Sequence, residues 1–187
     1  YPWSVWDSGA QTLSVGSSSE SDIGKKIVLV GLDGNYDVQT DEVTLTTQTG
    51  NLSTKQFLRI HLAYVSFGGT NVGIITVKVN TTDVMLINIG NATSLAAIYT
   101  IPNGYTGYLF KGVCTCQASA DGTGKMYVRP SGNGGIFRIA HSFEVSGGSE
   151  YDYEFSFPPE IPEKSDIDVR ITNRSNNARY TAAYDLL

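Results

Sequence analysis

Charged side chains, cysteine and histidine are all scarce in this chain of 187 residues. Asp, Glu, Lys and Arg together make up 17% of the sequence, and only two Cys and two His occur. Acidic residues outnumber basic ones, which gives a formal net charge of −5. The chain therefore lacks the clustered Lys and Arg that bind the phosphates of nucleic acids, and we expect no nucleic-acid partner.

Long apolar segments are missing as well. No 18 consecutive apolar residues occur, so the sequence predicts no transmembrane helix and no membrane partner. The first ten residues, "YPWSVWDSGA", have neither the basic head nor the apolar core of a signal peptide. Because the sequence begins with Tyr instead of Met, it leaves open a further segment before Tyr1.

Residues that favour β-strands fill most of what remains. The chain has 20 Gly and 11 Tyr, and its apolar segments consist mainly of Val, Ile, Thr and Tyr. With 41% hydrophobic residues, this is the composition of a globular protein, long enough for one large or two small domains.

The order of apolar and polar residues predicts about a dozen short strands joined by turns. "KKIVLVGL", the turn "DGNY" and "DVQTDEVTLTT" together form a predicted hairpin. Residues 51–67 alternate with period two and are predicted as one strand whose apolar face holds Leu58, Ile60, Leu62 and Tyr64. Loops are predicted at "SVGSSSESDIG", at "SGNGG" (131–135) and at "NRSNNA" (173–178), and "DGTGK" is predicted as a hairpin turn.

The predicted fold class is therefore all-β. We expect one or two linked antiparallel β-sandwich or jelly-roll-like units with essentially no long helix. Residues 1–95 form the predicted N-terminal half and residues 96–187 the C-terminal half. The segment "NATSLAAI" between them is the least unfavourable candidate for a helix.

Two patterns raise the question of a metal site. Cys114 and Cys116 lie two apart, which on a strand places both thiols on one face at the limit of disulfide reach, so we expect two reduced thiols. Asp33, Asn35 and Asp37 have the odd spacing of a calcium loop, but the Gly and Glu that an EF-hand needs next are absent. A hairpin tip explains these three residues better, weak calcium binding is the alternative, and no metal or other cofactor is predicted.

Catalytic residues are hard to find. His61 and His141 each lie on the polar face of an alternating strand, where a surface or lining role is commoner than catalysis. Neither Gly-x-Ser-x-Gly nor His-Glu-x-x-His occurs. A pair of glycosidase carboxylates remains open among the 18 Asp and Glu, although nothing points to one. We expect a protein that is not an enzyme.

Aromatic residues suggest two kinds of binding surface. Tyr1, Trp3 and Trp6 form an aromatic N-terminal segment that either packs on the chain's own sheet or acts as an arm contacting a neighbouring subunit. Four tyrosines could stack on sugars, although cross-strand packing is the commoner use of such residues. They are Tyr105, Tyr108, Tyr151 and Tyr153.

Four Asn-x-Ser/Thr sequons also occur, and we expect them to be unmodified. They begin at Asn51, Asn80, Asn91 and Asn173.

Several phrases together resemble a known group of proteins. They are "VLVGLDGNYDVQTDEVTL", "FLRIHLAYV" followed by "GGTNVGIITV", "YTIPNGYTGYL" and "FPPEIPEKSDIDVRI". Their succession is similar to virion structural proteins of tailed bacteriophages, frequent in marine phages. The similarity runs from about Val30 to the C-terminus and rests on turns, proline corners and strand patterns. The aromatic N-terminal segment and the Cys pair are not explained by it.

The resemblance implies a non-enzymatic component of a phage particle. A capsid decoration or stabilising protein that assembles by symmetric contacts is the leading expectation, with itself and the major capsid protein as partners. A head–tail connector or tail component is the alternative within the particle, and a carbohydrate- or receptor-binding β module is the alternative outside it. In such a protein "PPEIPEK" is expected to be a stiff corner between the two final strands.

Overall fold

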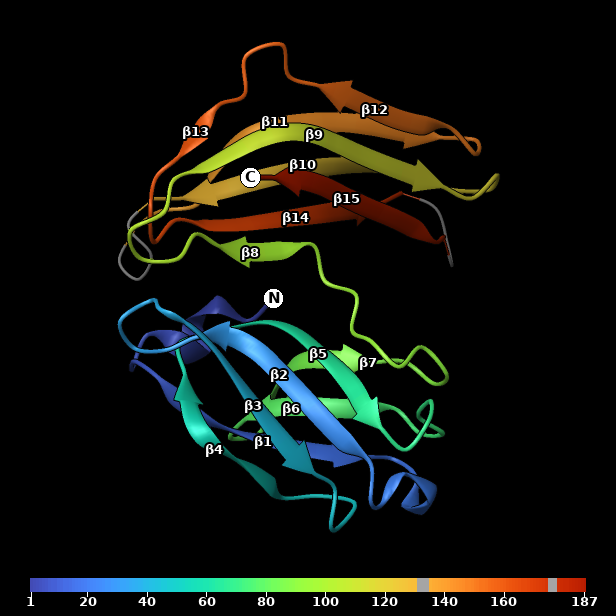
Figure 1. The fold of residues 1–187 in the computed structure, drawn as a ribbon. Helices are drawn as coiled ribbons and strands as arrows, with labels where there is room; N and C mark the ends of the chain where they lie inside the picture. Colours follow the sequence, from blue (N-terminus) through green and yellow to red (C-terminus); the bar gives the residue numbers. More distant parts are fainter. Residues whose placement is uncertain (131–134, 175–177) are drawn as a thin grey trace. The chain divides into compact units, whose positions relative to one another are not determined.

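The structure is a computed structural model, and it describes residues 1–130, 135–174 and 178–187. Fifteen strands and two short 3-10 helices, η1 (Trp3–Trp6) and η2 (Glu20–Asp22), make up its regular elements (Figure 1). Every strand pairing within the described residues is antiparallel, and the predicted all-β class is confirmed. No helix of the described part is long and apolar enough to cross a membrane.

The chain divides into two compact units, Tyr1–Ala96 and Ala97–Leu187. Each contains its own sheets, and no strand pairing joins one unit to the other within the described ranges. That each half folds as a domain of its own stays a prediction.

Unit 1 has two antiparallel sheets, one of four strands and one of three. The four-stranded sheet has the order β4-β1-β6-β7 and the three-stranded sheet the order β3-β2-β5. Their bounds are β1 Gln11–Ser17, β2 Lys26–Leu32, β3 Val38–Thr44, β4 Asn51–Phe57, β5 Arg59–Phe67, β6 Ile75–Val79 and β7 Thr82–Ile87.

Alternation along the central strands builds the core of unit 1. Leu13 and Val15 of β1 and Ile27 and Leu29 of β2 are fully buried, while the residues between them are less so. Successive side chains on a strand point to opposite faces, so each central strand turns one apolar face inward. Trp6 is also fully buried.

A β-bulge in β5 changes the face that the sequence predicts. Val30 pairs with Leu62 but Gly31 pairs with Ile60, so His61 is an extra residue in the ladder. The extra residue reverses the alternation: Ala63 is fully buried, whereas Leu62 is 36% exposed. The prediction that Leu62 continues the apolar face was therefore wrong. The predicted single strand 51–67 is likewise two strands, with a break between β4 and β5.

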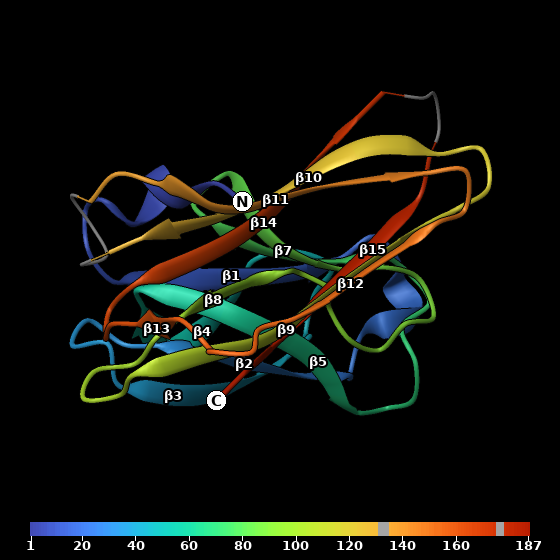
Figure 2. The ribbon, with the colours of Figure 1, turned by 90° about the horizontal axis from the view of Figure 1, so that it is seen from above.

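Unit 2 also has two antiparallel sheets. One has the order β11-β10-β14-β8; in the other, β9 lies between β15 on one side and β12 and β13 on the other (Figures 1 and 2). Their bounds are β8 Ile98–Thr100, β9 Gly107–Cys116, β10 Asp121–Arg129, β11 Arg138–Ser146, β12 Glu150–Glu154, β13 Glu160–Ile161, β14 Asp166–Asn173 and β15 Tyr180–Leu186.

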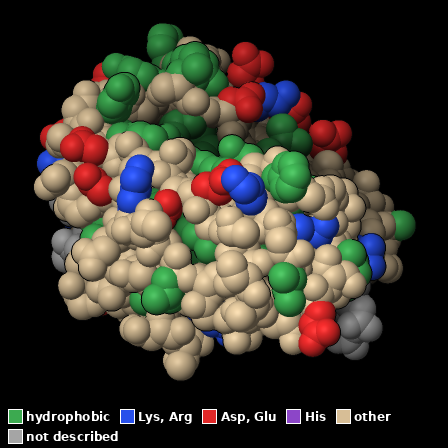
Figure 3. All heavy atoms as spheres, turned by 60° about the horizontal axis from the view of Figure 1, so that its bottom comes forward, with side chains coloured by type: hydrophobic (Ala, Val, Ile, Leu, Met, Phe, Trp, Pro, Cys, Tyr) green, Lys and Arg blue, Asp and Glu red, His purple; other side chains and the backbone are tan. Residues whose placement is uncertain are grey.

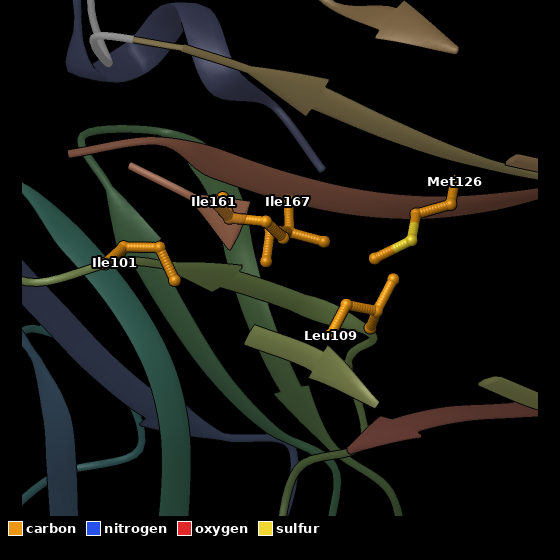
Figure 4. Packing of buried hydrophobic residues seen from close by; sticks show 5 residues of the cluster. All are labelled: Ile101, Leu109, Met126, Ile161 and Ile167. Carbon is orange, nitrogen blue, oxygen red and sulfur yellow. The ribbon is translucent and has the colours of Figure 1, made fainter. Parts of the chain in front are cut away.

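The core of unit 2 draws side chains from both of its sheets. Figure 4 shows one cluster, in which Leu109 of β9 meets Met126 of β10 and Ile167 of β14. A second cluster contains Cys114, Cys116, Ala120 and Val145. Because the clusters join residues from facing sheets, burial of apolar area holds the two layers together.

Strand β10 begins where the sequence predicts a turn. "DGTGK" forms the start of β10, and its Gly122 and Gly124 leave space for side chains of β15 and β11. A Cβ on Gly122 would lie 2.8 Å from the hydroxyl of Tyr180, and a Cβ on Gly124 would overlap the ring of Phe143. Here glycine supplies space and not a positive φ.

Two other local predictions need correction. The predicted loop at "SVGSSSESDIG" begins inside β1, which continues to Ser17. The segment "PPEIPEK" contains β13 and lies between β12 and β14, not between the two final strands. No helix forms at "NATSLAAI". Most of the predicted loop 131–135 and the middle of the predicted loop 173–178 lie outside the described residues.

Candidate interaction surface

The spacing of Asp33, Asn35 and Asp37 is explained by a hairpin turn. Asp33 Oδ1 accepts hydrogen bonds from the backbone N–H of Asn35 at 2.8 Å and of Asp37 at 3.0 Å. Tyr36 between them has a φ of 67°, as a tight turn requires. The described residues contain no group of three His, Cys, Asp or Glu that could hold a metal ion.

The Cys pair belongs to the core of unit 2. Cys114 is fully buried and Cys116 is 9% exposed, and both are free thiols. Burial, with a smaller contribution from Cys116, raises the pKa of the Cys114 thiol. Since the thiolate is the reactive form, this environment suits packing rather than nucleophilic chemistry.

A row of rings fills the space between the edge strands β11 and β12. We call it the aromatic row: His141 and Phe143 of β11, Tyr151 and Tyr153 of β12, and Phe155 just after β12. Phe143 stacks on Tyr151 with ring centroids 4.6 Å apart, and Tyr153 meets Phe155 edge-on at 4.7 Å. His141 Nε2 and the Tyr151 hydroxyl form a hydrogen bond.

Strand pairing explains why these rings meet. His141 pairs with Met126 and Tyr151 pairs with Cys114, so both rings share a face with core residues. Strands β11 and β12 belong to different sheets, and each is the last strand of its sheet. The aromatic row therefore extends the core of unit 2 to the side where β11 and β12 end the two sheets, which we call the open side. Burial, then the neighbouring Tyr153, raises the pKa of Tyr151.

Exposed apolar side chains also lie on or just beyond the edge strands β11 and β12. Tyr153 is 44% exposed, Ile139 of β11 is 54% exposed, and Phe157 beyond β12 is 90% exposed. Exposed apolar groups beside unpaired edge strands are typical of protein–protein contact sites. Figure 3 shows one face of the molecule, on which hydrophobic side chains form separate patches among mostly uncharged atoms.

The four tyrosines proposed for sugar stacking fall into two separate pairs. Tyr151 and Tyr153 belong to the aromatic row. Tyr105 is 66% exposed in the turn before β9, and Tyr108 is 38% exposed with its hydroxyl donating to Glu160 at 3.4 Å. No ring contact joins the two pairs in the described part of the chain.

The aromatic N-terminal segment forms η1. Trp3 is 7% exposed and Trp6 is fully buried. Tyr1 meets Trp3 edge-on at 4.6 Å, and the guanidinium of Arg59 lies 5.4 Å from the Trp3 ring centre. The role of Tyr1, Trp3 and Trp6 as a subunit-contact arm stays a prediction, and in this conformation the two indoles are covered.

The sequons differ in accessibility. Asn51 is 7% exposed, and its amide donates to the carbonyls of Val15 and Thr47. This side chain is committed to holding a loop. Asn80, Asn91 and Asn173 are exposed.

Sequence reasoning missed the edge strands as a candidate interaction surface. His61 belongs to β5 of unit 1 and His141 to β11 of unit 2. Neither the sequence nor the strand pairing brings the two histidines together in one site. The edge position of β11, β12 and β15 depends on which strands pair, which alternation alone does not specify.

Comparison with known protein families and with curated proteins finds no match. Among solved structures, the chain is weakly similar to T=1 particles derived from infectious bursal virus (13% identity, TM-score 0.29). It is also weakly similar to the T13 IBDV viral particle (14% identity, TM-score 0.30). Each alignment covers 95% of this chain and 53% of the other, so the chain spans about half the length of those proteins.

Proposed function

We propose that this chain is a non-enzymatic structural protein of a virus particle, of the tailed-bacteriophage type. Within the particle we place it on the capsid as a decoration or stabilising protein. It acts as an oligomer and contacts the major capsid protein. A head–tail connector or tail position is the alternative.

The observation that carries the proposal is the open side of unit 2. There the edge strands β11 and β12 lie beside the aromatic row and the exposed Phe157. An edge strand with exposed apolar side chains is a liability in an isolated protein, and in an assembly a neighbour covers it. The resemblance of the phrases from about Val30 onward to phage virion proteins supports the same function.

The surface composition fits this role. A sparsely charged exterior offers little to nucleic acid, while Tyr and exposed apolar groups suit close contacts between proteins. We therefore expect the chain to act through contacts and to require no cofactor.

Immunogold electron microscopy on intact particles tests the proposal. An antibody raised against this chain should label the whole capsid surface if the chain is a decoration protein. Label at a single vertex or along the tail would replace decoration by the connector or tail alternative. If intact and disrupted particles both fail to label while the same antibody detects the purified chain, the virion role is wrong, and the carbohydrate- or receptor-binding alternative should then be tested on a glycan array.

A further inference from the structure

Strand β15 leaves one long edge without a partner. Its seven residues, Tyr180–Leu186, pair with β9, and within the described residues no other strand pairs with β15. Thr181, Ala183 and Asp185 are exposed, and Arg179 just before the strand is exposed as well. This edge has no proline, and the strand carries one charged residue, so it has few of the features that block edge pairing.

The backbone hydrogen bonds show which groups on this edge face outward. The N–H of Gln117 on the β9 side donates to the carbonyl of Arg179 at 3.2 Å. The N–H of Cys116 donates to Ser149 on the opposite side of β9. Since backbone groups alternate along a strand, those of Arg179, Thr181, Ala183 and Asp185 face β9. The N–H and C=O groups of the residues between them face away from β9 and are available to another strand.

We propose that β15 pairs with β15 of a second copy of this chain, antiparallel about a two-fold axis at Ala182. In this register Ala182 lies opposite Ala182 of the second copy. The outward backbone groups of both strands then meet as hydrogen-bonded pairs, as an antiparallel ladder requires. The contact is isologous, because the same strand serves on both sides.

Charge complementarity is what selects this partner and this register. With Ala182 on the axis, Arg179 of each copy lies directly opposite Asp185 of the other. Both side chains lie on the outer face of the sheet, because odd-numbered residues share that face along β15. The two-fold axis therefore forms two Arg–Asp pairs, and Thr181 lies opposite the small Ala183.

The edge of β12 does not suit a second copy. Its outer face carries Glu150, Asp152 and Glu154, all exposed. A two-fold pairing about Asp152 would place carboxylates directly opposite one another at three positions, which is destabilising. Among these two edges, β15 is self-complementary and β12 repels its own copy, which leaves β12 for a different protein.

The inference goes beyond the proposed function and does not depend on it. A β15 pairing is a property of the purified chain, measured without any particle. Failure of the dimer would leave the virion role to be judged by the labelling of particles, and absence from particles would leave the dimer intact.

Sedimentation velocity of the full chain tests the proposal. The wild type should be a dimer at high micromolar concentration, and Arg179→Glu or Asp185→Arg should each raise the dimer dissociation constant by roughly tenfold or more, because each creates two like-charge pairs. The double variant R179E/D185R should restore dimerisation. Arg138→Glu, at another exposed charge, on β11, is the matched control and should leave the dimer unchanged.

Cysteine crosslinking tests the register. Positions 181 and 183 of opposite copies form a non-hydrogen-bonded pair with Cα atoms about 4.5 Å apart, which is within disulfide reach. T181C/A183C should therefore give a crosslinked dimer, whereas A183C alone should not, since residue 183 is diagonal to its own copy at roughly 7–8 Å.

Three results would overturn the proposal. They are a monomeric wild type at every concentration, a dimer that survives both charge reversals, and a crosslinked dimer from A183C alone. Far-UV circular dichroism of each variant, compared with wild type, establishes that a lost dimer reflects the edge and not an unfolded chain.

Discussion

Asp22 is a buried carboxylate that ties the η2 turn to the loop before β6. It accepts hydrogen bonds from the Ser17 hydroxyl at 2.6 Å and from the backbone N–H of Val72 at 2.7 Å and Gly73 at 2.8 Å. Lys25 Nζ lies 4.0 Å from Asp22 Oδ1. Burial by itself raises the pKa of Asp22, but these donors outweigh it, and the net shift is downward. The charged form is therefore the one that the fold stabilises.

Asp22→Asn should lower the free energy of unfolding at pH 7 by about 2–4 kcal/mol, because the amide cannot accept all three bonds. A pKa below the unfolded value means that this stabilisation is complete above about pH 4. It is lost as pH falls through the lower folded pKa. Urea unfolding of both proteins between pH 3 and pH 7, as rough limits, should show the difference shrinking at the acid end. A difference that is constant with pH would contradict the assigned role of the charge.

Gly124 lies where a larger side chain would not fit, whereas Gly112 has room for a Cβ atom. A Cβ on Gly124 would overlap the ring of Phe143, and that ring also stacks on Tyr151. Gly124→Ala should therefore cost about 1–3 kcal/mol in unfolding free energy. A Cβ on Gly112 would meet no heavy atom within 4 Å, so Gly112→Ala is the matched control. Thermal melting should separate the two variants; equal melting temperatures would show that Phe143 is not confined.

At the scale of elements, the segment between β12 and β13 keeps the edge of β9 paired despite its two prolines. The N–H of Leu109 donates to the carbonyl of Pro159 at 3.2 Å, and the N–H of Phe155 donates to Phe110 at 2.9 Å. Proline has no N–H to contribute, but its carbonyl still accepts, and its fixed φ limits the freedom of the unfolded chain.

The double variant Pro158→Ala/Pro159→Ala should lower the free energy of unfolding by about 1–2 kcal/mol through the unfolded state. The oligomeric state should be unchanged, because neither residue belongs to β15. Calorimetry and sedimentation on the same samples measure both quantities, with Ser156→Ala as the control within the same segment. An unchanged melting temperature would refute the stiffening role.

Sequence pattern identified the fold class and most strands because alternation and turn residues are local signals. Ile27 and Leu29 could be assigned to a buried face from the period alone. The bulge at His61 could not, since an extra residue in a ladder depends on the partner strand. Asp-Gly at Asp121 is typical of a turn, so the sequence predicted one there. The pattern does not show that Tyr180 and Phe143 occupy the space above Gly122 and Gly124.

The same distinction applies to the candidate surface. Tyr151 and Tyr153 were recognisable as aromatic residues at period two. His141 and Phe143 join them because β11 and β12 are the last strands of two different sheets, and the sequence does not show this arrangement. The edge position of β15 has the same origin, and long-range pairing of this kind is not encoded in a single segment.

At the scale of the whole molecule, the two units are expected to fold separately. Each has its own sheets and its own buried residues. Fragments of residues 1–96 and 97–187 should therefore each give a β-type circular dichroism spectrum and a cooperative unfolding transition. Loss of cooperative unfolding in either fragment, with the full chain as control, would show that the halves depend on each other.

The proposed role in a virus particle requires this chain to be present there in a fixed number of copies. Quantitative mass spectrometry of gradient-purified particles measures it directly, as copies of this chain per copy of the major capsid protein. We predict a ratio near one-to-one or one per three, as decoration of the shell requires. A dozen or so copies per particle would assign it to the neck or tail, and complete absence from purified particles would contradict the structural role altogether.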